Sequence, residues 1–274
     1  MSKYSNLSNC HLHSLFSSDS EEDICNIIET AIKLDFRYIC FTDHNDYDFP
    51  EKDEDGKPLF LLDFNKYIDT LEEYREEYAG KLNILIGVEQ GLMKSVADRV
   101  NEYDPEGRLD FIIGSSHLVN GLDPYYPEFW EGRDSGAVIE DYYKSIIENL
   151  SVCSNFDVYG HIDYIARYIV DESFNYSCFN YQDYIDVILK KIIESGKGIE
   201  INTAGYRTLG KPNPEEAIIK RYRELGGEII TMGSDAHKAV DLDFNYDKVS
   251  EILKRAGFEY YSVYRKRKAE FIKL

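Results

Sequence analysis

Short apolar runs typical of buried strands alternate along this chain with stretches typical of amphipathic helices, such as the one from Ile24 to Leu34. Strands that alternate with helices favour a parallel sheet joined by right-handed crossovers, and seven or eight such units fit a (β/α) barrel. The strand-like runs are Leu7–Leu12, Tyr38–Phe41, Ile84–Val88, Leu109–Ile113, Asp157–Tyr159, Gly198–Ile201 and Glu228–Met232, with Tyr260–Tyr264 as a weaker eighth.

All six histidines lie at the end of such a run or just past it, and three carboxylates share this kind of position. Imidazoles and carboxylates are the ligands expected for Zn, Mn or Fe. Because His11 and His13 are two residues apart, both rings would lie on one side of a strand and could chelate one ion. One tetrahedral ion needs only four ligands. We therefore predict a multinuclear site built from His11, His13, Asp19, His44, Glu89, His117, His161, Asp235 and His237.

The distribution of these residues favours a barrel over an open sheet. In a barrel, functional residues gather at the C-terminal ends of many different strands. An open doubly wound sheet concentrates its site at one switch point and usually has a glycine-rich first turn, and no G-x-G-x-x-G motif is present. The expected fold is therefore an α/β barrel with its site at the C-terminal ends of the strands.

The net charge of -20 bears on the choice of partner. Nucleic acids bind through clustered Lys and Arg, so this charge argues against them, and equally against an anionic membrane surface. An anionic substrate would need local positive charge from metals or from specific arginines. Arg167 and Arg207 lie just past strand ends and could bind phosphate oxygens in a bidentate manner, although surface ion pairs would also account for them.

Other segments carry weaker expectations. Met1 to Ser14 has no apolar signal core, and the five cysteines form no paired motif, so we expect reduced thiols and a cytoplasmic protein. The aromatic loop Gly121–Gly136 could be a lid over the site or a cluster that only packs on the barrel. Asn213-Pro214-Glu215-Glu216 has the pattern of a helix start with Asn213 as the cap.

Six motifs, taken in their order along the chain, resemble those of the polymerase and histidinol phosphatase (PHP) superfamily: His11-x-His13, Asp43-His44, Gly87-x-Glu89, Ser115-x-His117, Gly160-His161-x-Asp163 and Gly233-Ser234-Asp235-Ala236-His237. The resemblance covers nearly the whole chain and is greatest to the monofunctional histidinol-phosphate phosphatases, in length and in the segment Asn202–Arg207. It implies a distorted (β/α)7 barrel, one PHP-type domain over residues 1–274, and three divalent metal ions of Zn, Mn or Fe.

Carried over by motif, the resemblance assigns a role to each candidate residue. Glu89 and Asp235 would be the catalytic residues, with Glu89 shared by two metals. Arg167 and Arg207 match arginines that bind substrate phosphate. The first metal would be held by His11, His13, Glu89 and Asp235, the second by Glu89, His117 and His161, and the third by Asp19, His44 and His237. Several relatives have histidine where this chain has Asp19, which leaves the metal preference open.

The reaction implied is hydrolysis of L-histidinol phosphate to L-histidinol and phosphate, in histidine biosynthesis, through attack of metal-activated hydroxide on phosphorus. Asp43 and Asp163 could orient metal ligands, and together with Tyr164 they are also candidates for binding the cationic end of the substrate. Three alternatives remain: a related phosphoesterase for another small ester, a metal-dependent amidohydrolase, and a non-catalytic metal-binding or interaction module. An amidohydrolase would require a carbamylated lysine at a strand end, and no strand end offers one.

Overall fold

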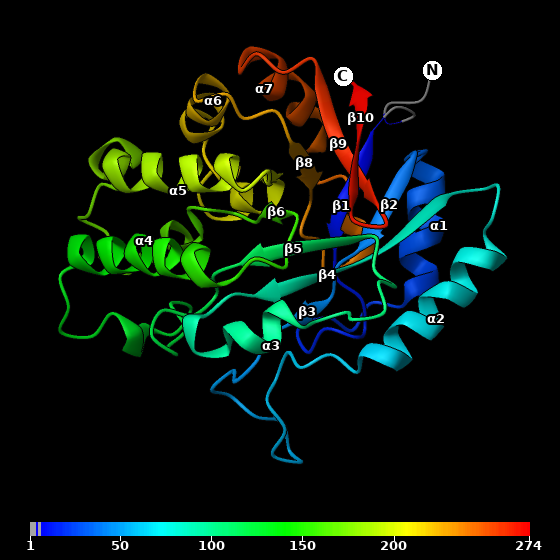
Figure 1. The fold of residues 1–274 in the computed structure, drawn as a ribbon, viewed down its shortest axis with the longest axis horizontal. Helices are drawn as coiled ribbons and strands as arrows, with labels where there is room; N and C mark the ends of the chain where they lie inside the picture. The colour runs from blue at the N-terminus through cyan, green and yellow to red at the C-terminus, as the bar shows by residue number, and fades with distance from the viewer. Residues whose placement is uncertain (1–3, 5–6) are drawn as a thin grey trace.

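Seven parallel strands, in the order β1-β2-β4-β5-β6-β7-β8, form the centre of the computed structural model, which describes residue 4 and residues 7–274 (Figure 1). The short strand β3 extends this sheet by pairing with β4. The bounds are β1 Ser8–Leu12, β2 Tyr38–Phe41, β3 His44–Asn45, β4 Asn83–Gly91, β5 Phe111–Ser115, β6 Val158–Tyr159, β7 Gly198–Asn202 and β8 Ile230–Gly233.

The first and last strands of this sheet meet at their C-terminal ends. The Asp235 backbone N–H donates to the His11 carbonyl at 2.9 Å, and the His13 N–H donates to the Ala236 carbonyl at 2.9 Å. These two hydrogen bonds join β1 to β8 and give the sheet the shape of a nearly closed barrel, as predicted.

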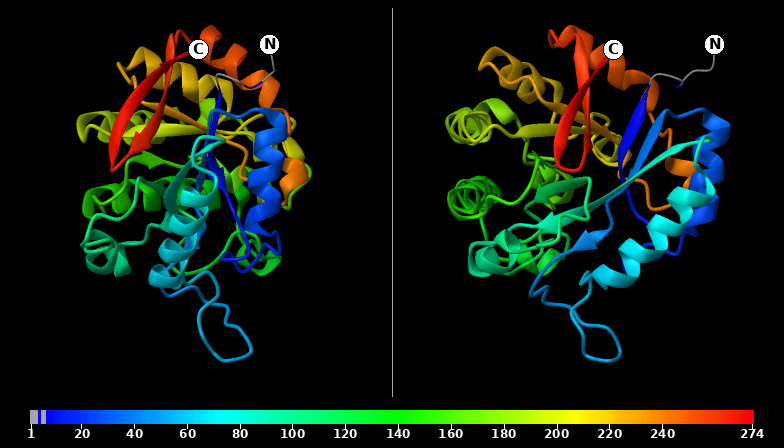
Figure 2. Two further views of the ribbon diagram at one scale, coloured as in Figure 1. Left: turned by 90° about the vertical axis from the view of Figure 1, so that its right-hand side faces the viewer. Right: turned by 45° about the vertical axis from the view of Figure 1, so that its right-hand side comes forward.

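A helix follows each strand of the barrel, counting β2 and β3 as one unit. Figures 1 and 2 show α1 and α2 on one side of the sheet and α4 and α5 on the opposite side. Asp23, Asp63 and Asp134 cap α1, α2 and α4 by accepting backbone N–H groups of the first turn. The bounds are α1 Ile24–Leu34, α2 Phe64–Glu77, α3 Ala97–Asn101, α4 Ser135–Val152, α5 Gln182–Glu194, α6 Glu216–Glu224 and α7 Val249–Arg255. None of the helices in the described part of the chain has the length and apolar character needed to cross a bilayer.

The weak eighth run is a strand, as expected, and it lies outside the seven-stranded barrel: β9 (Tyr260–Arg265) pairs antiparallel with β10 (Lys268–Lys273). The tip of this hairpin binds Asp110 and Asp157, just before β5 and β6, so it lies at the N-terminal end of the barrel. Asn213 is not a helix cap, because α6 begins at Glu216 with Glu215 as its N-cap.

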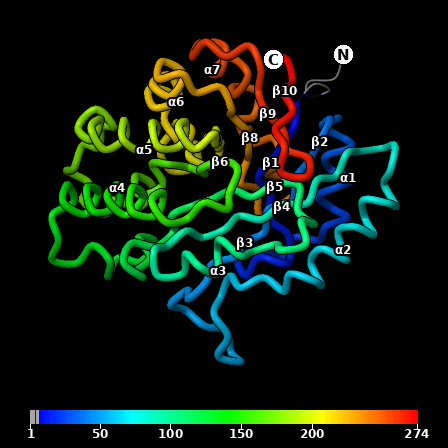
Figure 3. The backbone as a smooth tube through the Cα atoms, viewed as in Figure 1, coloured from blue at the N-terminus to red at the C-terminus, as the bar shows by residue number. Residues whose placement is uncertain are grey.

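The segment between β3 and α2 projects from the body of the barrel (Figure 3). Its ends return to the C-terminal side of the sheet, where Phe49, Leu59 and Phe60 line a cavity beside the predicted site. The fold therefore brings loops from both halves of the chain to the end of the barrel where the predicted ligands lie.

Candidate metal centre and active site

The structure brings all nine predicted metal ligands together at the C-terminal end of the barrel. His11, His44 and Glu89 lie within strands β1, β3 and β4, and the others lie in the loops after β1, β5, β6 and β8. The register of β3 against β4 places His44 directly opposite Glu89. A buried, nearly closed sheet thus supplies ligands from six positions around its rim.

The first predicted ligand group has the spacing of a metal site. His11 Nε2 lies 3.1 Å from His13 Nε2, 3.1 Å from Glu89 Oε2 and 3.7 Å from Asp235 Oδ1. His13 Nε2 lies 3.5 Å from Glu89 Oε2 and 3.3 Å from Asp235 Oδ1. Ligand bonds of ~2.1 Å in a tetrahedral site imply ligand–ligand distances of ~3.4 Å. Asp235 itself has a left-handed backbone (φ 53°), a conformation that non-glycine residues rarely adopt and that is often found at functional sites.

The second group shares Glu89 with the first. Glu89 Oε1 lies 2.8 Å from His161 Nε2 and 3.2 Å from His117 Nε2. The same oxygen accepts a hydrogen bond from the Ser115 hydroxyl at 2.7 Å. The two carboxylate oxygens of Glu89 therefore face two different sets of imidazoles, which is the arrangement of a bridging ligand.

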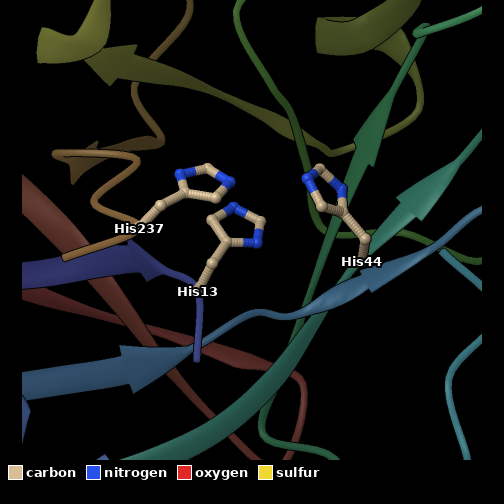
Figure 4. A group of neighbouring side chains, drawn as sticks. All are labelled: His13, His44 and His237. Carbon is tan, nitrogen blue, oxygen red and sulfur yellow. The ribbon is translucent and has the colours of Figure 1, made fainter. Parts of the chain in front are cut away.

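The third group is built around His44 and His237, which approach His13 from strand β3 and from the loop after β8 (Figure 4). The His13 ring lies 4.1 Å from the His237 ring and 4.2 Å from the His44 ring, measured between centroids. Asp19 Oδ2 is 3.0 Å from His237 Nε2 and 3.7 Å from His44 Nε2. The predicted trio of Asp19, His44 and His237 is therefore assembled, with His13 as an additional neighbour.

The charges and hydrogen bonds of the cluster suit cations. Burial, together with the nearby imidazoles of His237 and His44, lowers the pKa of His13 to about 3, so this ring is neutral and has a free lone pair. Burial raises the pKa of Glu89, but three imidazoles outweigh this effect and hold it well below its usual value, so it is ionised. Buried atoms without a hydrogen-bond partner in the described chain include Glu89 Oε2 and His237 Nε2, which face other predicted ligands. Such atoms are costly unless something binds them, and metal ions would do so.

A cavity of about 360 Å³ opens over this cluster. Arg167 lines it, with its Nη1 3.4 Å from Asp235 Oδ2 and its side chain 10% exposed. Arg207 lies just outside: its Nη1 is 3.5 Å from the Asp235 carbonyl, and its Nη2 is 3.4 Å from Asp241. Both predicted arginines are therefore next to Asp235, but only Arg167 faces the cavity.

The aromatic loop Gly121–Gly136 has parts that match both expectations. Tyr125 and Tyr126 line the cavity, whereas Phe129 and Trp130 are buried in the core. Tyr164 also lines the cavity, as expected.

Asp43 and Asp163 are buried and do not line the cavity, which excludes them as contacts for a substrate. Asp43 is instead linked to His13 through Ser17, whose hydroxyl donates to the Asp43 carboxylate at 2.8 Å and lies 3.0 Å from His13 Nδ1.

Three residues near the site were not found from the sequence. Asp46 accepts from His117 Nδ1 at 2.8 Å and forms a ligand group with His44 and His117. Its spacing from His44 repeats the two-residue pattern of His11 and His13, and that signal could have revealed it. Asn213 accepts from Arg167 Nε at 2.6 Å, and Glu200 lies 2.6 Å from His11 Nδ1. Neither of these two has a local sequence signal.

Comparisons with known proteins agree with this geometry. The family model described as "PHP domain" matches residues 9–204. A protein of Clostridium acetobutylicum named "Probable histidinol-phosphatase" is 35% identical over 91% of this chain and 93% of its own. A "Histidinol-phosphatase" of Lactococcus lactis is 29% identical over 90% of each chain.

Solved structures show the same fold. A histidinol phosphate phosphatase of Lactococcus lactis, complexed with Zn, L-histidinol and phosphate, superposes with a TM-score of 0.83 at 26% identity, covering 97% of this chain and 99% of that one. A Listeria monocytogenes structure gives a TM-score of 0.75 at 19% identity, covering 88% of this chain and 99% of that one, and supports the fold.

Proposed function

This chain belongs to the PHP domain family, and from that premise we propose that it is a metal-dependent phosphomonoesterase that hydrolyses L-histidinol phosphate to L-histidinol and phosphate. The observation that carries the proposal is the meeting of the nine predicted ligands beside one cavity, which seven of them line together with Arg167. The similarity to the Lactococcus lactis enzyme, whose structure holds Zn, L-histidinol and phosphate, supports the choice of substrate.

Three divalent ions of Zn, Mn or Fe are proposed as the cofactors. The first would be held by His11, His13, Glu89 and Asp235, the second by Glu89, His117 and His161, and the third by Asp19, His44 and His237. When bound, divalent ions supply Lewis acidity that polarises a phosphoryl group and acidifies water. The distances within the first two groups and the unpartnered buried atoms support this assignment.

The residues around Asp235 connect the metal ligands to the proposed phosphate site. Asp235 Oδ1 faces His11 and His13, while its Oδ2 accepts from Asn202 Nδ2 at 3.2 Å and faces Arg167 at 3.4 Å. Arg167 Nε donates a hydrogen bond to Asn213, and this bond fixes the orientation of the guanidinium and of its remaining N–H groups. Arg167 would bind phosphate oxygens and stabilise the negative charge that develops on them.

Part of the cavity lining suits a cationic group. Asp123 lines the cavity together with Tyr125, Tyr126 and Tyr164, and no lysine of the described chain does so. Carboxylate pairing and cation–π contact would favour the ammonium or imidazole end of histidinol phosphate. The ends of nucleoside or sugar phosphates are neutral or anionic and lack this attraction. The second candidate function is that of a PHP-type phosphoesterase for another small ester, because the cluster of predicted metal ligands by itself is compatible with both substrates.

Substrate profiling tests the proposed function. We expect kcat/KM for L-histidinol phosphate to exceed that for a nucleoside monophosphate and for a sugar phosphate of similar size by about 100-fold or more, equivalent to about 2.7 kcal/mol. Steady-state phosphate release in the presence of Mn, Zn or Fe measures the three values. A ratio near one would reject the substrate and leave a general phosphoesterase. No phosphate release from any ester would favour a non-catalytic module.

Replacing Arg167 by alanine should weaken catalysis without loss of metal. The loss of one charged hydrogen-bonding group costs about 1.5–3 kcal/mol, so we expect kcat/KM to fall about 10- to 150-fold, with KM raised. Arg207→Ala should lower kcat/KM less strongly, because the Arg207 side chain is 33% exposed and pairs with Asp241. Kinetics and elemental analysis on the same preparations provide the measurement. Unchanged kinetics in both variants would show that neither arginine binds phosphate.

We further propose that residues 1–274 form one PHP-type domain, since one hydrophobic core packs against strands and helices from β1 to β9. A cytoplasmic location and the absence of nucleic-acid or membrane partners are proposed on the net charge of -20 and on the five cysteines, which are free thiols.

A further inference from the structure

Glu200 is a carboxylate buried in the middle of the barrel, and no lysine or arginine of the described chain forms an ion pair with it. Side chains alternate along β7, so Glu200 and Asn202 share one face and Ile199 and Ile201 share the other. The Glu200 side chain is 1% exposed, and in the described chain His11 is its one ion-pair partner, with Nδ1 2.6 Å from Oε1. Barrel interiors are normally filled by branched apolar residues, and a buried charge is costly, so this glutamate requires a specific reason.

The surrounding backbone is shaped to admit this pair. A Cβ atom on Gly233 would lie 2.4 Å from Glu200 Oε1 and 2.4 Å from the His11 Cβ. Any larger residue in place of Gly233 would therefore clash with both side chains and push the Glu200 carboxylate away from the His11 imidazole. The second oxygen, Oε2, accepts from the His161 backbone N–H at 3.3 Å and from Asn202 Nδ2 at 3.3 Å. Both oxygens are thus held in place.

We propose that Glu200 is a positioning residue for the metal centre, acting through His11. A carboxylate that accepts from Nδ1–H leaves the lone pair on Nε2, and in this structure His11 Nε2 faces His13, Glu89 and Asp235. Glu200 therefore fixes the tautomer and the direction of the ring, and its charge makes the imidazole a stronger ligand. The inference rests on the proposed metal centre, but it does not depend on the identity of the substrate.

Three variants separate this role from a general contribution to stability. Glu200→Gln keeps the shape and removes the charge, and Glu200→Asp keeps the charge but draws the carboxylate away from His11. Asp157→Asn is the matched control, because Asp157 is also a buried carboxylate beside a barrel strand, but it pairs with Arg267 near the N-terminal end of the barrel. For each, zinc affinity is measured by competition with a chromophoric chelator, together with the absorption spectrum of the cobalt-substituted protein and the Tm of the metal-free protein.

We expect Glu200→Gln to bind one zinc ion about 10- to 100-fold more weakly than the wild type and to alter the cobalt spectrum. The zinc affinity of Glu200→Asp should lie between those of the wild type and of Glu200→Gln. Asp157→Asn should lower the Tm and leave zinc affinity and spectrum unchanged. Wild-type affinity and spectrum in Glu200→Gln, or an equal loss of affinity in Asp157→Asn, would overturn the proposal. If Glu200→Gln does not fold, wild-type affinity and spectrum in Glu200→Asp would overturn it in the same way. If the wild type binds zinc but does not hydrolyse histidinol phosphate, only the proposed substrate is rejected, and the role proposed for Glu200 is unaffected.

Discussion

Replacing Glu89 by glutamine is expected to lower kcat/KM by about 1,000-fold or more, equivalent to about 4 kcal/mol. The carboxylate contacts imidazoles with both oxygens: Oε2 is 3.1 Å from both His11 Nε2 and His44 Nδ1, and Oε1 is 2.8 Å from His161 Nε2. Glutamine has the same shape, but it lacks the negative charge and turns an NH₂ donor toward atoms that should bind metal. The variant therefore loses the link between the first two ligand groups.

His44→Ala is the comparison for Glu89→Gln. His44 belongs to the proposed third group and touches Glu89 on one side only, so we expect a smaller loss, about 10- to 100-fold. Steady-state kinetics and metal analysis of both purified variants give the order. A larger loss of kcat/KM in His44→Ala than in Glu89→Gln would contradict the bridging role of Glu89. It would indicate that the third ligand group is the more important one for the reaction.

Removal of metal by a chelator should abolish activity, and re-addition of Zn, Mn or Fe should restore it. The fully loaded chain is expected to contain about three ions, because the nine predicted ligands lie in three neighbouring groups beside one cavity. Binding to the folded state alone should also raise the Tm, since an ion at 100 times its Kd adds about 2.7 kcal/mol of stability. Elemental analysis, activity and thermal unfolding are measured on one preparation before and after chelation. Full activity in protein without bound metal would refute the proposed chemistry.

The sequence was sufficient to predict the barrel and the nine clustered residues because both depend on a local signal. A polar residue that ends an apolar strand run is visible without tertiary information, and parallel strands bring such ends together. His117 and His161, which follow different strands, were found in this way, and both contact the same carboxylate oxygen of Glu89.

The residues that support the ligands could not be predicted in the same way. Glu200 lies inside a strand and meets His11 only because the sheet curves round to bring β7 near β1. Asn213 has the local pattern of a helix cap, but its backbone pairs with Asn202 and its side chain binds Arg167, and these tertiary contacts outweigh the cap. The strand β9 matched the strand pattern correctly but paired outside the barrel, because its partner β10 follows it directly.

The seam where β1 meets β8 has a consequence for how activity arises during folding. Its hydrogen bonds join Asp235 to His11 and Ala236 to His13, residues from opposite ends of the chain. Contacts so distant in sequence form slowly, because a long loop must be ordered before they contribute any stability. Since both sides of the seam carry predicted metal ligands, an incomplete barrel has no complete site. The onset of phosphatase activity in a refolding experiment should therefore report ring closure itself, later than signals from helix formation.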